Sequence, residues 1–317
     1  MYVELKNINK TYGSYQASRN VNFGIEKGKL IGLLGPSGSG KTTILRMIAG
    51  LETPDSGEVI IDGKVVNDVP ASQRGIGFVF QNYALFPTMT VQQNIEVIPE
   101  MLGWERRKRE KIADQLLEKV GLDPTIYRNR MPQELSGGEQ QRIGIVRALA
   151  ASPEVILMDE PFSALDPLSR ASLQDLVLSL HRELGTTIVF VTHNMDEAIK
   201  LGDRIAVMKE GELIQCDQPD QLLTQPKNEF VRSFFDETIQ QKQQTVKELI
   251  VADDYSKGLH QADFPDVYLS TPLTEVFELL IQHEAVNIRE NEENLGEITR
   301  KDIFTYLSRK ERENERI

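Results

Sequence analysis

A glycine-rich stretch, "GPSGSGKTT", has the residue types and the spacing of a phosphate-binding loop. It matches the pattern G-x-x-x-x-G-K-S/T, and it lies between the apolar "KLIGLL" and the helix-like "TILRMIAGL". Glycines let backbone N–H groups point at phosphate oxygens, and the N-terminus of a helix adds positive potential. The alternative is a glycine-rich turn that binds nothing. The predicted phosphate ligands are Gly35, Pro36, Ser37, Gly38, Ser39, Gly40, Lys41, Thr42 and Thr43.

A second stretch, "VILMDE", supplies the two carboxylates that a phosphate site needs. Asp159 and Glu160 end a predicted buried strand, and that end is expected beside the phosphate-binding loop. We expect Thr42 to ligate Mg²⁺ and Asp159 to hold the ion through its outer coordination shell. We expect Glu160 to act as the general base that accepts a proton from the attacking water. The alternative is a strand that ends in two solvated acids.

A third stretch, "QELSGGEQQR" at residues 133–142, has the form of an anion site but contains no lysine. It combines a polar turn with Gly137 and Gly138, and a predicted helix follows them. The chain already has a complete phosphate-binding loop elsewhere. The presence of a second, incomplete anion site therefore needs an explanation.

The elements that position these stretches alternate along the chain. Residues 1 to about 80 are predicted to form mostly antiparallel strands, "GIGFVFQ" among them, with the all-apolar "KLIGLLG" suited to a buried parallel sheet. Helical spacing runs from about 84 to 150. Two further buried strands, "PEVILMDE" and "GTTIVFVTH", flank a helix-like segment. Alternating strands and helices predict a parallel sheet with crossover helices.

Composition limits the classes of function. The chain has 317 residues, 40% of them hydrophobic, which is enough for one large domain and a smaller one. A formal charge of -12 argues against sequence-independent binding to nucleic acid, and the basic "WERRKREK" is expected to be a solvated helix face. The single Cys216 excludes an internal disulfide, fits a reducing cytosol and is expected to be a small buried apolar residue. We find no signal peptide pattern, and no apolar run approaches the roughly 20 residues that cross a bilayer.

Residues 1 to about 235 resemble the ATP-binding cassette (ABC) ATPases, because the motifs of that family occur here in its order. "LSGGEQQR" is the specific one, whereas a lone aromatic, glutamine or histidine means little without its neighbours. In chain order the motifs are Tyr12 in "NKTYGSY", the phosphate-binding loop, Gln81 in "FVFQNY", "LSGGEQQR", "VILMDE", "SALD" ending at Asp166, and His193 in "FVTHNMDEA".

The resemblance explains the incomplete anion site. In this family the signature loop binds the γ-phosphate of an ATP that the phosphate-binding loop of another subunit holds. Two copies of the chain are therefore expected to enclose two ATPs with Mg²⁺, and the second loop needs no lysine. Hydrogen-bond donors suffice for an anion that a different chain already holds by charge. The signature residues are Ser136, Gly137, Gly138 and Glu139.

The resemblance also implies roles for four single residues. Tyr12 is expected to stack on adenine, and Gln81 to contact Mg²⁺ and water and to link them to membrane subunits. Asp166 is expected to couple the two sites, and His193 to contact the γ-phosphate. Each has an ordinary alternative: Tyr12 as a core residue, Gln81 as a strand end, Asp166 as a helix N-cap, and His193 as a loop histidine with satisfied hydrogen bonds.

One cassette without a membrane span looks most like the separate ATPase subunit of a bacterial importer. "NIEVIPEMLGW" resembles the quaternary-amine branch, which imports glycine betaine, carnitine and choline. The alternatives are an importer of another amine, amino acid or small cation, and a non-transport ATPase acting on nucleic acid or ribosomes, which the acidic composition disfavours. Tyr83, Leu85 and Phe86 are candidates for receiving a coupling helix of the membrane subunit, and a core role is the alternative.

The segment from about 248 reads as strand, helix, two strands across the turn "ENEEN", and helix. It resembles one CBS (cystathionine β-synthase) repeat, a module found in pairs behind such ATPases. Residues 236–265 are too few and too polar for an earlier repeat, so a second chain would have to supply the pair. In "GEITRKD", Thr299 and Asp302 match positions that contact a regulatory adenine nucleotide, and a helix N-cap is the alternative. Sensing of ionic strength and pure dimerisation are the other functions that the segment could have.

These interpretations combine into an α/β fold. The expected ABC ATPase domain, residues 1–235, has a RecA-like core, an antiparallel β subdomain and a helical subdomain. A linker at 236–247 and a small α+β CBS-like domain at 248–317 follow it. The expected partners are a second copy of the chain, transmembrane permease subunits and, through the permease, an extracytoplasmic solute-binding protein or domain. Nucleic acid is not expected, and the expected location is the cytoplasmic face of the plasma membrane.

Overall fold

The structure, a computed structural model, describes residues 1–163, 165–235, 245–252, 255, 264–290, 293–303, 305, 306 and 309. The chain divides into two compact units, Met1–Arg232 and Ser233–Ile317. Within the described residues, no helix is both long and apolar enough to span a bilayer.

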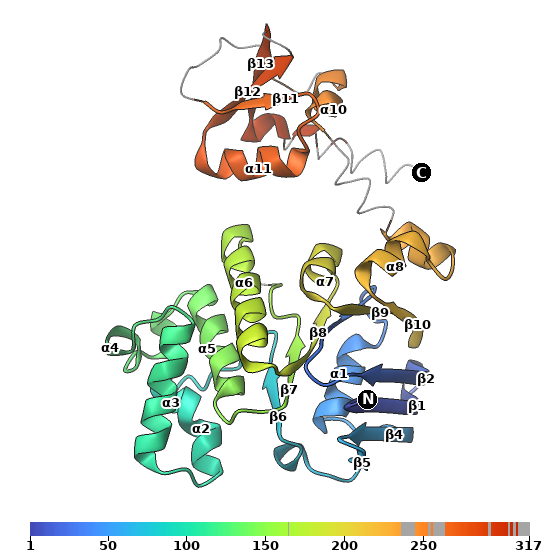
Figure 1. The fold of residues 1–317 in the computed structure, drawn as a ribbon, viewed down its shortest axis with the longest axis vertical. Helices are drawn as coiled ribbons and strands as arrows, with labels where there is room; N and C mark the ends of the chain where they lie inside the picture. The colour runs from blue at the N-terminus through green and yellow to red at the C-terminus, as the bar shows by residue number, and fades with distance from the viewer. Residues whose placement is uncertain are drawn as a thin grey trace. The chain divides into compact units, whose positions relative to one another are not determined.

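The first unit contains an antiparallel and a mostly parallel sheet (Figure 1). The antiparallel sheet has the order β2-β1-β4-β5 and comprises β1 (Val3–Tyr12), β2 (Tyr15–Ile25), β4 (Ser56–Ile61) and β5 (Lys64–Val65). The larger sheet has the order β10-β9-β3-β8-β7-β6 and comprises β3 (Leu30–Leu34), β6 (Ile76–Val79), β7 (Val155–Asp159), β8 (Thr187–Thr192), β9 (Arg204–Lys209) and β10 (Glu212–Asp217).

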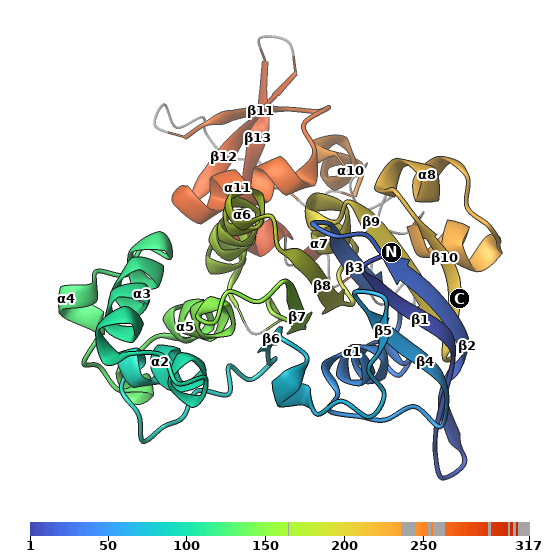
Figure 2. The ribbon, with the colours of Figure 1, turned by 60° about the horizontal axis from the view of Figure 1, so that its bottom comes forward.

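Most helices of this unit connect these strands, and α8 follows the last strand, β10. Figures 1 and 2 show α2 to α5 grouped on one side of the unit and the antiparallel sheet on the other. The helices are α1 (Lys41–Ala49), α2 (Val91–Met101), α3 (Arg106–Lys119), α4 (Pro124–Tyr127), α5 (Gly137–Leu149), α6 (Pro167–Leu184), α7 (Met195–Leu201) and α8 (Pro219–Thr224), with 3-10 turns at Ala71–Gln73 and Pro132–Glu134.

The parallel strands are buried on both faces, as their near-continuous apolar sequences predict. Along β7, Ile156 and Met158 belong to a core shared with α5 and α6, whereas Val155 and Leu157 belong to a second core shared with α1 and the antiparallel sheet. Because successive side chains of a strand point to opposite faces, one strand joins both cores. The predicted parallel sheet with crossover helices is confirmed.

One strand assignment from the sequence is wrong. "GIGFVFQ" was grouped with the antiparallel strands, but Ile76–Val79 forms β6, which pairs in parallel with β7 at the edge of the larger sheet. Close packing against α5 fixes this position, since a Cβ on Gly77 would lie 2.5 Å from the backbone oxygen of Ala148. The β9–β10 hairpin was not predicted from the sequence. Cys216, on β10, is only partly buried, and burial raises the pKa of its thiol to about 11.

The second unit has its own three-stranded sheet, in the order β11-β12-β13. The predicted order of strand, helix, two strands and helix is confirmed in its described part, although residues 291 and 292 of the predicted turn lie outside it. Of the expected linker, 236–244 also lies outside the described residues, and Val246 is 0% exposed in the core of this unit. The elements are α10 (Val246–Val251), β11 (Asp266–Tyr268), α11 (Leu273–Gln282), β12 (Ala285–Glu290) and β13 (Glu293–Thr299), with a helical turn over 300–303.

Candidate functional site

The phosphate-binding loop connects the buried strand β3 to α1. Gly35, Gly38 and Gly40 have φ angles of 156°, 76° and 95°, a backbone region that side chains with a Cβ rarely adopt. A Cβ on Gly40 would lie 2.0 Å from the oxygen of Ala17, and one on Gly35 would lie 2.2 Å from the oxygen of Met208. Only glycine fits at these two positions, and the loop keeps the conformation that exposes its N–H groups to an anion.

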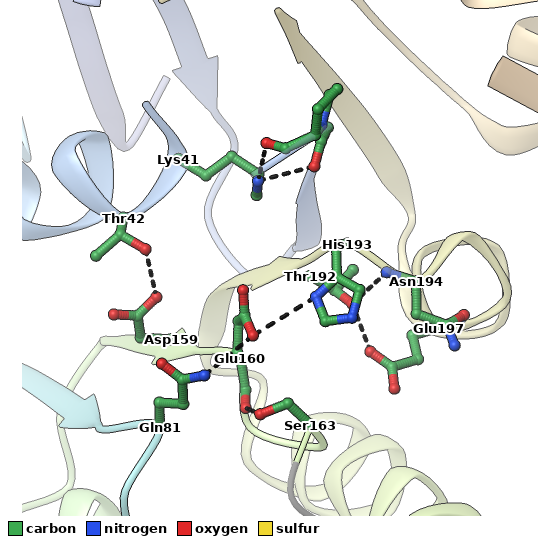
Figure 3. A network of polar contacts seen from close by, with 12 residues as sticks. Lys41, Thr42, Gln81, Asp159, Glu160, Ser163, Thr192, His193, Asn194 and Glu197 are labelled. Atoms are coloured by element: carbon green, nitrogen blue, oxygen red, sulfur yellow. Dashed lines mark hydrogen bonds and ion pairs between the residues drawn. The ribbon is translucent and has the colours of Figure 1, made fainter. Parts of the chain in front are cut away.

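Lys41 begins α1 and curls back over this loop (Figure 3). Its ammonium donates to the backbone oxygens of Gly35 and Pro36, at 2.8 Å each, and the residue is only 6% exposed. Burial lowers the pKa of Lys41, whereas the carboxylates of Glu160 and Asp159 act in the opposite direction. The loop therefore holds one cation at its centre, where outer phosphates would need it.

Thr42 and Asp159 present oxygen atoms side by side (Figure 3). The hydroxyl of Thr42 donates to Oδ1 of Asp159 at 2.8 Å, from the first turn of α1 to the end of β7. Asp159 is 7% exposed, so burial raises the pKa of its carboxyl, against the hydrogen bond from Thr42 and the nearby Arg46 and Lys41. Hydroxyl and carboxylate oxygens are the ligand types that Mg²⁺ prefers, and few protein ligands suffice when phosphate supplies the rest. The pair fits the ion.

Glu160 lies at the meeting point of three loops. Its carboxylate accepts from Nε2 of Gln81 at 3.2 Å and lies 3.5 Å from Nδ1 of His193 (Figure 3). Its backbone is left-handed, with φ 45°, and its N–H donates to the oxygen of Val191 at 3.1 Å. A left-handed non-glycine residue costs conformational energy, and such strain is concentrated at functional sites. The structure thus brings together the three residues that the sequence assigned to catalysis.

The loop that carries His193 is fixed by residues that the sequence analysis did not single out. Glu197, 5% exposed, accepts from the hydroxyl of Thr192 at 2.5 Å, and that hydroxyl accepts from the N–H of Asn194 at 2.9 Å. The side chain of Asn194 accepts in turn from the N–H of Glu197 at 3.2 Å. Burial raises the pKa of Glu197, and the bond from Thr192 opposes that rise. The sequence signal that could have pointed to Glu197 is an acidic residue inside a helix that packs on the sheet.

The adenine candidate lies at the surface. Tyr12 is 44% exposed, which excludes the alternative of a core residue, and its hydroxyl donates to Glu52 at 2.8 Å. Lys10 lies 5.3 Å from the centre of the Tyr12 ring and pairs with Glu52 at 2.8 Å. Tyr15, which the sequence analysis missed, donates from its hydroxyl to the oxygen of Gly38 in the phosphate-binding loop. The exposed ring of Tyr12 is therefore held in place by Glu52 and Lys10. Tyr15 supports the phosphate-binding loop.

The signature residues form the N-terminus of α5. Ser136 is the N-cap, and its hydroxyl accepts from the N–H of Glu139 at 3.3 Å while the carboxylate of Glu139 accepts from the N–H of Ser136 at 2.7 Å. Tyr127 donates to the same carboxylate at 2.6 Å. Ser136 and Gly137 are exposed. In the described part of the chain, no hydrogen bond or ion pair joins these residues to the phosphate-binding loop.

The structure gives the positions of Asp166 and of Tyr83, Leu85 and Phe86, the candidates for receiving a coupling helix of the membrane subunit. Asp166 is the N-cap of α6 and accepts from the N–H groups of Leu168 and Ser169 at 3.1 and 3.0 Å, and hydrogen bonds from Ser169 hold the pKa of its carboxyl low. The structure thus shows the capping alternative for Asp166. Leu85 packs against the core, Phe86 is 45% exposed, and Tyr83 is half-buried.

Comparison with known proteins identifies a family. The sequence pattern of the family described as "ABC transporter" matches residues 18–163. The osmoprotectant import ATP-binding protein OsmV of Salmonella typhimurium is 42% identical over 312 residues, which cover 95% of this chain and 80% of that protein. Two Bacillus subtilis proteins are similar over a shorter part of the chain. The choline transport ATP-binding protein OpuBA is 51% identical over 233 residues, covering 73% of this chain and 61% of that protein. The glycine betaine/carnitine/choline transport ATP-binding protein OpuCA is 50% identical over 235 residues, covering 73% and 62%.

A solved structure is similar to the cassette. It is described as a dimeric structure of a post-hydrolysis state of the ATP-binding cassette MJ0796 bound to ADP and Pi, with a TM-score of 0.62 at 39% identity. The similarity covers 68% of this chain and 98% of the other. Together with the geometry of the phosphate-binding loop and the identity to OsmV along nearly the whole chain, this likeness shows that the chain belongs to the ATP-binding proteins of the ABC transporter family and is an ATPase that uses ATP with Mg²⁺.

Proposed function

We propose that this ATPase drives an ABC importer for compatible solutes of the glycine betaine, carnitine and choline type. The observation that carries the proposal is the match to OsmV along 95% of the chain, which includes the second unit. The two Bacillus subtilis relatives named for choline and for glycine betaine, carnitine and choline support the same solute class. The chain would act at the cytoplasmic face of the membrane, with permease subunits and an extracytoplasmic solute-binding protein supplied by other chains.

The geometry supports a division of labour at the nucleotide. The N–H groups of the phosphate-binding loop and Lys41 bind the phosphates, and Thr42 with Asp159 holds Mg²⁺, which neutralises charge on the phosphates when bound. Glu160 accepts the proton of the attacking water, because its carboxylate is the acceptor on which Gln81 and His193 converge. Gln81 and His193 hold this carboxylate in place. Gln81 also contacts the water, and His193 contacts the γ-phosphate.

The signature residues serve the ATP of a partner copy. Exposed Ser136 and the N–H groups at the start of α5 are donors, and the signature residues 136–139 include no cationic side chain. A second chain, arranged head to tail, brings its phosphate-binding loop and bound ATP to them. Asp166, already bonded to its own helix, would couple the two sites through the position of α6, and exposed Tyr12 would stack on adenine.

An uptake assay tests the solute class. The chain is combined with candidate permease subunits and a candidate solute-binding protein in proteoliposomes loaded with MgATP. We expect ATP-dependent uptake of glycine betaine, carnitine or choline, and none with the Glu160→Gln subunit. Spermidine and putrescine are the informative competitors, because a relative named for their import is 46% identical over 232 residues. Uptake of spermidine or putrescine without uptake of any quaternary amine would contradict the proposal.

The second unit is proposed to be a single CBS-like repeat that pairs with the same unit of a partner chain and binds an adenine nucleotide that lowers transport. Its Thr299 and Asp302 form a reciprocal cap: Thr299 donates from its hydroxyl and its N–H to Asp302 at 2.6 and 2.8 Å, and the N–H of Asp302 donates back at 3.4 Å. The capping alternative is therefore realised in the structure. A nucleotide would have to bind Thr299 and Asp302 while these two residues also cap the helical turn that follows.

Calorimetry on the full-length chain separates the two roles of this pair. Asp302→Asn keeps an oxygen that can accept from Thr299, so it should lower stability by less than the roughly 1 kcal/mol that loss of the cap would cost. AMP is the probe, because it lacks the outer phosphates that Lys41 recognises. We expect wild-type protein to bind AMP and Asp302→Asn to lose that binding while it stays folded. No heat from the wild-type chain at near-millimolar AMP would end the nucleotide proposal and leave the cap and dimerisation.

A further inference from the structure

The segment that follows Gln81 contains two consecutive left-handed residues. Tyr83 and Ala84 have φ angles of 60° and 46°, and neither is a glycine. Hydrogen bonds within the segment close it, from the N–H of Tyr83 to Phe80 at 3.2 Å and from the N–H of Ala84 to Asn82 at 2.6 Å. Non-glycine residues rarely adopt this region, and two in succession persist only when neighbouring structure holds them. We call residues 82–90, which directly follow Gln81, the Gln81 loop.

Arg147 supplies that hold from α5. Its Nη1 donates to the oxygen of Ala84 at 2.6 Å and its Nη2 donates to the oxygen of Tyr83 at 3.1 Å. The residue is 6% exposed, and burial lowers the pKa of its guanidinium. Within the described residues, no carboxylate lies within 4.0 Å of this guanidinium. A buried cation needs acceptors, and here the acceptors are the carbonyls of the two left-handed residues.

Tyr83 makes a second connection to the same helix. A Cβ on Gly137, in the signature, would lie 3.1 Å from the hydroxyl of Tyr83, and a Cβ on Gly144 would lie 3.5 Å from its backbone oxygen. Tyr83 therefore lies along α5, from the signature glycine towards Arg147. The ring of Phe86 also lies 5.9 Å from the guanidinium of Arg147.

The rest of the Gln81 loop is fixed from α2. Buried Asn94 accepts from the N–H of Phe86 at 2.8 Å and donates to the oxygens of Phe86 and Thr90 at 3.2 and 3.0 Å. Asn94 thus fixes the part of the loop that carries Phe86, whereas Arg147 fixes the part that adjoins Gln81. Only the second clamp comes from the helix that begins at the signature.

We propose that Arg147 is a positioning residue that fixes the Gln81 loop to the signature helix α5, so that Gln81 beside Glu160 and Ser136 at the start of α5 shift as one unit. This inference rests on the proposed function, which gives both ends of the connection their roles at the nucleotides. A displacement of the exposed Phe86 is then passed to the groups that bind the partner's ATP. The connection runs through one buried guanidinium and two strained residues.

Hydrogen exchange on the full-length chain tests the mechanical part without any nucleotide. Arg147→Lys keeps the charge, but a single ammonium does not reproduce the planar fork that bonds two carbonyls. We expect the amides of the Gln81 loop and those at Glu139 and Gln140 to exchange at least about tenfold faster, because both ends lose the same restraint. Faster exchange in the loop with unchanged exchange at the signature would show that the two move independently, and the inference would be wrong.

Arg74→Lys is the matched control for that experiment. Arg74 is partly buried, burial lowers the pKa of its guanidinium as it does for Arg147, and it donates to the carbonyls of Met47 and Ile48 at 2.8 and 3.0 Å. Its loss removes the same kind of clamp at the end of α1. We expect lower stability from this variant and wild-type exchange at the Gln81 loop and the signature.

A second arm measures function in a Glu160→Gln background, where hydrolysis does not consume the ATP. We expect Arg147→Lys to raise the protein concentration needed for ATP-driven dimerisation by about tenfold, since small misplacements of contact groups have large effects. Nucleotide affinity of the monomer should be unchanged. Adding Ala84→Gly should restore part of the loss, because glycine adopts the left-handed region without a Cβ.

Each outcome of this arm is decisive. Dimerisation within about twofold of the parent would overturn the inference. Failure of Ala84→Gly to restore any of the loss would show that Arg147 does not act through the left-handed pair. If the Glu160→Gln parent itself does not dimerise with ATP, the proposed function fails instead, and hydrogen exchange still decides the role of Arg147.

Discussion

Replacing Glu160 with Gln should slow ATP hydrolysis by at least about a hundredfold while ATP binding stays nearly intact, which is the upper part of what one general base contributes. The substitution keeps the size of the side chain and an oxygen that can accept from Gln81, so the loop geometry should survive. What it removes is the carboxylate on which Gln81 and His193 converge at 3.2 and 3.5 Å. Because binding and dimer closure do not need that base, an ATP-bound closed dimer should accumulate.

The measurements are steady-state hydrolysis in the purified transporter complex and size-exclusion chromatography of the isolated chain with MgATP. Glu154→Gln is the control, because Glu154 precedes the same strand β7 at the opposite end and pairs with Lys27 at 2.8 Å on the surface. We expect wild-type turnover from it. Near-wild-type turnover of Glu160→Gln would remove Glu160 from the role of base.

Lys41→Ala and Ser136→Arg should each abolish most activity, for different reasons, and a mixture of the two variants should recover part of it. Lys41→Ala removes the cation that the phosphate-binding loop holds at its centre, so nucleotide binding weakens. Ser136→Arg leaves that loop intact and spares binding to the monomer, but it places a bulky side chain at the exposed start of α5 and blocks closure on the partner's ATP.

The recovery follows from the composition of the mixed dimer. One of its two sites combines both substitutions and is inactive. The other combines the phosphate-binding loop of the Ser136→Arg chain with the signature of the Lys41→Ala chain, and both of these halves are wild type. Activity in the mixture should therefore exceed that of either variant alone. If no mixing ratio recovers activity, the shared site or the independence of the two sites is contradicted.

The Ser136→Arg variant needs a control for its lost helix cap, because the structure shows Ser136 and Glu139 as a capping box. Loss of such a cap costs about 1 kcal/mol of stability. Asp123→Ala removes a side-chain cap at the start of α4, outside the Gln81 loop. Equal shifts in melting temperature for the two variants, with closure lost in Ser136→Arg alone, would assign the defect to the signature and not to the cap.

The sequence determined the parts of the site that lie within one short stretch of backbone. The phosphate-binding loop is local: its glycines, Lys41 and Thr42 occur within eight residues, and the strand and helix on either side fix its shape. Asp159 was placed correctly because the C-terminal ends of all the parallel strands lie along one edge of the sheet, and its contact with Thr42 at 2.8 Å agrees with that rule. The order of the predicted elements followed from hydrophobic periodicity for the same local reason, although the β9–β10 hairpin was not among them.

The tertiary structure alone decided the contacts between distant segments. Nothing in the spacing of Glu197 and Thr192 shows that they would fix His193, and nothing near Arg147 points to the carbonyls of Tyr83 and Ala84, which lie 64 and 63 residues away. β6 was misassigned because a short alternating strand looks alike in either kind of sheet, and only its packing against α5 selects the parallel neighbour. A sequence motif reflects the requirements of its own stretch of backbone. The partner of a buried charge and the neighbour of an edge strand depend on which surfaces meet when the whole unit packs. The sequence of either segment alone does not determine that choice.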